Sequence, residues 1–111
     1  MGFWRDELID FALDQDTSRH IEEQRAAIAA DPSDPAPYYR LALLCRMQGR
    51  QDAALGLLLE AVRLDPGLAA VHAALAEIYA ARDDPEAARR HADRAAELGD
   101  RRALEMLVRY R

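Results

Sequence analysis

The chain has 111 residues, a length that corresponds to one domain with a modest core. Half of its residues are hydrophobic but only 6% are aromatic, so alanine supplies much of the apolar surface and we expect a thin, elongated core. A net charge of -5 argues against a general nucleic-acid binder, which needs a basic excess. The single cysteine, Cys45, excludes an internal disulfide and fits a reducing, cytoplasmic location.

Neither membrane insertion nor secretion is predicted. The longest apolar runs, such as residues 53–59, fall well short of the roughly 18 residues that a membrane span needs. Charged residues at Arg5, Asp6 and Glu7 leave no apolar region for a signal peptide. Asp6 also stands where a myristoylation motif has serine or threonine.

Two helices are predicted before the first proline. Residues 3–13 and residues 18–30 both carry apolar side chains at helical spacing. Between them, the sequence Asp-Gln-Asp-Thr-Ser at residues 14–18 has side chains that compete for backbone hydrogen bonds, so we expect a turn there. Thr17 or Ser18 would then cap the second helix.

Five further helices follow, each bounded by residues that start or stop a helix. Asp34-Pro35 and Asp84-Pro85 combine a capping acid with a proline in the first helical position. Gly49 and Gly99 suit the left-handed conformation that ends many helices. With no period-two strand pattern, the sequence predicts an all-α fold of about seven helices. The five helices are expected at residues 35–48, 51–64, 69–82, 85–98 and 101–110.

An internal repeat links the first four of these five helices. Leu41 and Leu75 are 75 − 41 = 34 positions apart, and small and large residues recur at the same offset. A fixed period of this length indicates a repeat protein. The other pairs at this offset are Ala42 with Ala76, Cys45 with Tyr79, Ala54 with Ala88, Ala61 with Ala95, and Leu64 with Leu98.

Helix pairs at this period resemble the tetratricopeptide repeat (TPR) family. That motif has large residues at positions four, seven and eleven, small residues at eight, twenty and twenty-seven, and proline at thirty-two. Cys45 replaces the aromatic at position eleven of the first repeat, His72 the one at position four of the second, and Asp100 the final proline. The matching residues are Tyr38, Leu41, Ala42, Ala54, Ala61 and Pro66, and then Leu75, Ala76, Tyr79, Ala88 and Ala95.

The resemblance implies a small stand-alone TPR domain of bacterial type covering residues 1–111. Its antiparallel helix-turn-helix repeats would stack as a short right-handed superhelix, an α-solenoid. Residues 35–68 and 69–100 are the two clear repeats. Residues 1–34 match weakly and are interpreted as a degenerate capping repeat, with His20 where a tight helix crossing wants alanine. Residues 101–111 are interpreted as a C-terminal capping helix.

The resemblance also implies a concave groove lined by the first helix of each pair. Tyr39, Leu43 and Met47 would anchor a partner, and Arg46 and Glu77 would orient it. Whether the N-terminal helices cover Leu43 and Met47 is left open. The expected partner-binding residues are Tyr39, Leu43, Arg46, Met47, Ala70, Ala73, Glu77, Ala80 and Ala81, with Arg5, Ile9, Ala12 and Leu13 as an extension.

Enzymatic chemistry is not predicted. His20, His72 and His91 lack the short spacing of metal ligands, although His72 and His91 could approach across a helix pair. Cys45 falls on a core position and is expected to be a buried, structural thiol. There is no phosphate-binding loop and no nucleophile elbow. We therefore expect no metal, no cofactor and no catalytic residue.

The sequence therefore favours a non-catalytic scaffold that binds a peptide or helix of a partner protein. Chaperone tails are not expected ligands, because Tyr39, Leu43, Ala73 and Glu77 replace the Lys, Asn and Arg of the carboxylate clamp found in one TPR subclass. Nucleic acid is not expected either, because acids interleave the arginines of residues 89–102. The alternative is a structural protein that forms a homodimer through an apolar face or through its C-terminal helix.

Overall fold

The computed structural model describes the backbone of residues 2–109 and the side chains of residues 15–109. Within that backbone there is no strand, and the all-α prediction is confirmed. Six helices are present where about seven were expected, and the difference lies entirely before the first proline. The helices are α1 (Gly2–Ala30), α2 (Pro35–Met47), α3 (Gln51–Leu64), α4 (Ala69–Ala81), α5 (Pro85–Glu97) and α6 (Arg102–Arg109).

The prediction of two N-terminal helices is wrong, because α1 runs unbroken through residues 14–18. This segment contains neither proline nor glycine, and its polar residues lower helix propensity by only a few tenths of a kcal/mol each. Ion pairs at helical spacing stabilise the helix where the turn was expected. Arg19 lies 3.1 Å from Asp16 and 4.0 Å from Glu23. Thr17 and Ser18 are therefore interior helical residues rather than caps.

The starts of α2 and α5 and the end of α2 follow the expected local rules. The Asp34 carboxylate accepts a hydrogen bond from the Ala36 amide at 3.0 Å, and Asp84 accepts one from Ala87 at 3.2 Å. Each acid satisfies an amide that the first helical turn leaves without a partner. Gly49 follows α2 with φ of +75°, a conformation that glycine adopts without steric cost.

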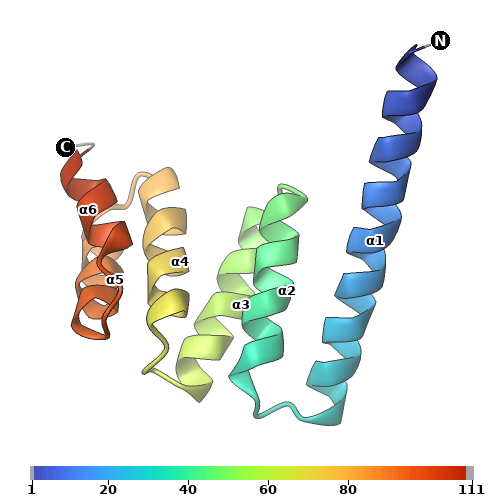
Figure 1. Cartoon of the computed structure of the whole chain (residues 1–111). Helices are drawn as coiled ribbons and strands as arrows, with labels where there is room; N and C mark the ends of the chain where they lie inside the picture. Colours follow the sequence, from blue (N-terminus) through green and yellow to red (C-terminus); the bar gives the residue numbers. More distant parts are fainter. Residues whose placement is uncertain (1, 110–111) are drawn as a thin grey trace.

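The helices stack side by side as a short solenoid (Figure 1). α2 packs on α3 and α4 packs on α5, while α6 packs on both α4 and α5. α1 forms one end, contacts α2, and its N-terminal half extends past the end of α2. The radius of gyration is 16.0 Å, compared with about 13 Å for a compact domain of this length. The molecule is therefore elongated.

Two hydrophobic clusters hold the stack together, and they differ in side-chain size. The cluster around α2, α3 and the near side of α4 contains Leu41, Leu58, Leu75 and Ile78. The cluster that joins α4 to α5 and α6 consists of alanines, with Leu104 and Leu107 packed against it. Cys45 is buried in the first cluster, as its position in the repeat predicted.

Candidate functional site: a groove along α2, α4 and α6

The first helices of the two repeats lie next to each other and leave a shallow hollow of 220 Å³ between them. Tyr39 and Leu43 come from α2, where they are four residues apart and therefore share a face. α4 contributes a wall of short side chains, and Arg102 and Ala103 at the start of α6 close the far side. The α4 residues are Ala70, Ala73, Ala74 and Glu77.

An ion pair crosses this hollow. The Arg46 guanidinium of α2 donates to the Glu77 carboxylate of α4 at 3.0 Å. Arg46 is more covered than Glu77, with 27% and 45% of their side chains exposed. The two residues expected to orient a partner are therefore bonded to each other in the chain alone. A partner would have to share their remaining hydrogen-bonding capacity or displace the pair.

The apolar residues of α2 are open to solvent. Leu43 is 36% exposed and Met47 is 74% exposed. Together with Arg46 and Gln51 they line a second hollow of 380 Å³. Most of the Met47 side chain is therefore exposed at the end of α2.

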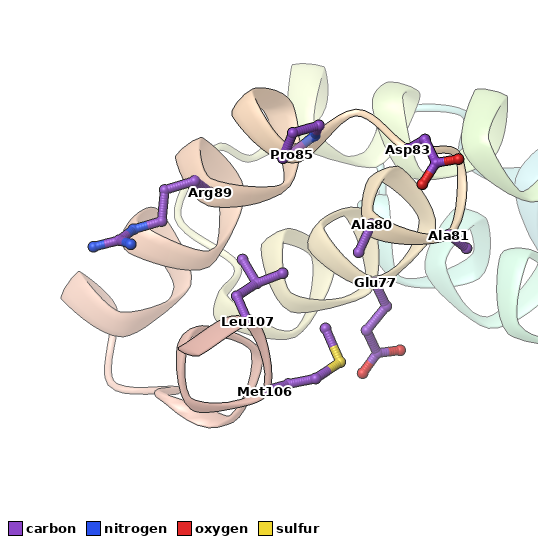
Figure 2. A pocket seen from close by; sticks show the side chains of 8 residues that line it. All are labelled: Glu77, Ala80, Ala81, Asp83, Pro85, Arg89, Met106 and Leu107. Carbon is purple, nitrogen blue, oxygen red and sulfur yellow. The ribbon is translucent and has the colours of Figure 1, made fainter. Parts of the chain in front are cut away.

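The groove continues into a larger pocket of 620 Å³ at the C-terminal end of α4 (Figure 2). Ala80, Ala81 and Pro85 form one wall, and Met106 and Leu107 of α6 face them from the other side. Glu77 and Asp83 bring carboxylates to the rim, while the Arg89 side chain points away from the opening. Its volume lies in the range of about 300–1,000 Å³ typical of ligand pockets.

Every residue of the expected partner-binding set therefore lines one of three adjoining hollows. The proposed extension by Arg5, Ile9, Ala12 and Leu13 falls among residues whose side chains the structure does not describe. Sequence reasoning missed the contribution of Met106 and Leu107, because residues 101–111 were interpreted only as a cap. The 34-residue offset carried the signal, since it relates Leu107 to Ala73 of the groove.

A second polar feature lies away from the groove, between α4 and α5. His72 is 5% exposed; its Nε2 is 2.8 Å from the Pro66 carbonyl oxygen, and its Nδ1 is 3.1 Å from Nδ1 of His91. The His91 ring also stacks on Tyr79, with ring centroids 5.6 Å apart. The approach of His72 and His91 that the sequence suggested does take place.

The hydrogen bonds restrict where the protons of both histidines lie. The Pro66 carbonyl can only accept, so Nε2 of His72 carries a proton. One of the two facing Nδ1 atoms then donates to the other. Burial, His72 and Arg90, in that order, hold the pKa of His91 below its ordinary value. The pair thus links α4, α5 and the turn before α4.

A metal centre is not formed by these histidines. Among residues whose side chains are described, no group of three or more His, Cys, Asp or Glu side chains is arranged to hold an ion. None of the helices, over their described residues, is both long enough and apolar enough to cross a bilayer.

The fold is similar to that of several solved structures. The solved structures most like this chain include a MamA double mutant from RS-1, with a TM-score of 0.70 and 25% identity over 86% of this chain. MamA from Desulfovibrio magneticus RS-1 gives a TM-score of 0.68 at 25% identity, and MamA from AMB-1 gives 0.66 at 26% identity over 81% of this chain. Each match covers 53% of the MamA chain, so this chain spans about half of those structures.

No protein in the curated set matches the chain by sequence. The family model described as Tetratricopeptide repeat matches residues 14–70. That segment includes the second half of α1, all of the α2–α3 pair and the start of α4, and is more than half of the chain. Together with the stacked helix pairs and their 34-residue period, this match shows that the chain belongs to the tetratricopeptide repeat family.

Proposed function

We propose that the chain is a non-catalytic interaction module that holds a short segment of a partner protein in the groove along α2, α4 and α6. The observation that carries the proposal is the solvent-exposed apolar surface of α2 beside an adjoining hollow and pocket. Leu43 and Met47 would anchor the segment at one end. The pocket bounded by Met106 and Leu107 would take an apolar side chain at the other.

The composition of the groove supports this function. Alanines along α4 let a partner backbone come close, and methionines adapt their shape to different apolar surfaces. The Arg46–Glu77 pair supplies polar groups midway along the groove, which would fix the direction of a bound segment. Recognition of an amphipathic helix or an extended peptide by such a surface is a common mode of protein binding.

The experiment is capture of partners from an extract of the source cells with three baits: the parent chain, Leu43→Asp and Leu59→Asp. Leu59 is 42% exposed on α3 and lines none of the groove hollows, so its variant is a matched control for adding a charge to a surface leucine. We expect proteins that bind the parent and the Leu59 variant but not the Leu43 variant. Equal capture by all three baits would place the binding site elsewhere. Circular dichroism establishes that each variant is still folded.

A further inference from the structure

The outer face of α3 carries a stripe of exposed residues. Ala54, Leu58 and Ala61 are the buried residues of α3. A helix turns about 100° per residue, so the opposite side presents four residues within a stripe about 60° wide. All four are exposed: Asp52, Gly56, Leu59 and Arg63.

Gly56 is the unexplained member of this stripe. It lies in the middle of α3, where glycine weakens a helix relative to alanine. It does not have a left-handed φ, and a Cβ built at this position would meet no atom within 4 Å. No contact with the residues whose side chains are described therefore requires glycine here. A glycine on an exposed helix face does permit the close approach of a second backbone.

The stripe is complementary to itself when reversed. Residues 52 and 63, and residues 56 and 59, are both centred on the bond between Leu57 and Leu58. In an antiparallel pair of α3 helices with a two-fold axis at that point, Leu59 of each copy faces Gly56 of the other. Asp52 of each copy then faces Arg63 of the other, so a large residue meets a small one and an acid meets a base. Such an arrangement is what a two-fold interface requires.

We propose that the outer face of α3 binds a second copy of this chain in an antiparallel, two-fold dimer. The two charged residues are not locked into the chain by burial: 89% of the Asp52 side chain and 68% of the Arg63 side chain are exposed. Asp52 pairs with Arg82 at 2.6 Å, and Arg63 pairs with Glu60. In the dimer the Asp52–Arg63 contacts join these two pairs into a network of alternating charge.

The groove stays open in this dimer, because only Gln51, the first residue of α3, lines any of its hollows. The inference is therefore independent of the proposed function. The sequence suggested self-association through an apolar face or through the C-terminal helix, and this inference places it on α3. A 14-residue helix is about 21 Å long, so the contact is smaller than the roughly 800 Å² per partner of a standard interface. We expect weak, concentration-dependent association.

The test is sedimentation velocity of the whole chain over a range of concentrations up to about 1 mM, the scale on which so small an interface would bind. The parent chain is expected to move from monomer toward dimer. Asp52→Arg and Arg63→Asp each place two like-charged pairs across the axis and should weaken association on the order of tenfold. Mixing the two variants restores both opposite-charge pairs, so the mixture should associate as the parent does.

Two further variants separate this dimer from other forms of association. Gly56→Ala should raise the melting temperature of the monomer and weaken the dimer, opposite effects that a purely structural role would not produce. Leu43→Asp in the groove should leave the dimer unchanged. The proposal fails if the parent stays monomeric, if the mixed variants do not associate, or if the groove variant abolishes association while the α3 variants do not.

Discussion

The two helix pairs share one repeat pattern but fill their interiors differently. The α2–α3 pair has Cys45 and Leu58 where the α4–α5 pair has Tyr79 and Ala92, each 34 positions later. The large side chain thus comes from the second helix in one pair and from the first helix in the other. Cys45, Leu58 and Ala92 are buried, and Tyr79 is partly buried. Each pair therefore places one large and one small side chain between its helices, but the helix that supplies the large one differs between the pairs.

The two pairs also differ in polarity, because the second pair contains two histidines. His72 and His91 occupy the positions that Tyr38 and Leu57 hold in the first pair. Tyr38 donates its hydroxyl to the Pro32 carbonyl oxygen at 3.1 Å, and His72 bonds the Pro66 carbonyl at 2.8 Å. Both residues therefore tie their helix to the turn that precedes it. Only in the second pair does the link extend to the partner helix, through His91.

The largest effect is expected from Leu58→Ala. Leu58 is fully buried, and truncating a core leucine costs about 2–5 kcal/mol through lost burial and the cavity left behind. Urea unfolding measures the change. The neighbouring Leu59→Ala is the control and should cost less than about 1 kcal/mol because Leu59 is partly exposed. Similar losses for both variants would contradict the assignment of Leu58 to the core.

The reciprocal change, Ala92→Leu, should also destabilise the chain, by about 1–3 kcal/mol, because Tyr79 already supplies bulk in this pair. Arg94→Leu, at an exposed position on the same helix, is the control for adding leucine to α5. The double variant Tyr79→Cys with Ala92→Leu recreates the first pair's combination. The double variant should be more stable than the sum of the two single changes predicts. If the two changes in unfolding free energy simply add, the two side chains do not share one space.

A smaller effect is expected where α2 and α4 end. Gly49 and Asp83 are at the same place in their repeats, and both have positive φ, +75° and +57°. A residue with a Cβ pays a steric cost there, so Gly49→Ala should destabilise by about 1 kcal/mol and Asp83→Gly should stabilise by about 0.5–1 kcal/mol. Thermal unfolding gives both values. If both substitutions changed the stability in the same direction, backbone strain would not be the cause at these turns.

The smallest effect concerns pH. Because folding lowers the pKa of His91, the unfolded chain binds this proton more readily. The resulting stability is present above about pH 6.5, the ordinary value, and is lost as pH falls from there through the lower pKa of the folded state. His91→Gln should flatten the dependence of the urea midpoint between pH 7.5 and 5. An unchanged slope would show that another group is responsible.

Much of the fold could be predicted because it depends on local signals. Proline, glycine and capping acids mark the starts and ends of α2 and α5, and the repeat period identified buried residues such as Ala42 and Ala88. The continuity of α1 could not be predicted from those signals, because Asp-Gln-Asp-Thr-Ser is tolerated in a turn and in a helix. The balance between helix propensity and local side-chain hydrogen bonds decides between the two, and the residue pattern alone does not determine that balance.

The candidate site was likewise predictable only in part. The lining residues of α2 and α4 followed from the repeat, since each has a fixed place in its helix. The Arg46–Glu77 bond and the pocket beside Met106 depend on how α2, α4 and α6 come together. A residue pattern gives the face on which a side chain lies but not the partner it finds there.

The most direct test of the central proposal is site-specific photo-crosslinking in the source cells. Met47 in the groove and Glu86, an exposed residue of α5 that lines none of the hollows described above, are each replaced by a photoreactive phenylalanine derivative, and crosslinked peptides are identified by mass spectrometry. We predict crosslinks from position 47 to one contiguous segment of a partner, and none to that segment from position 86. Crosslinks to a partner from position 86 alone would contradict the groove as the binding site.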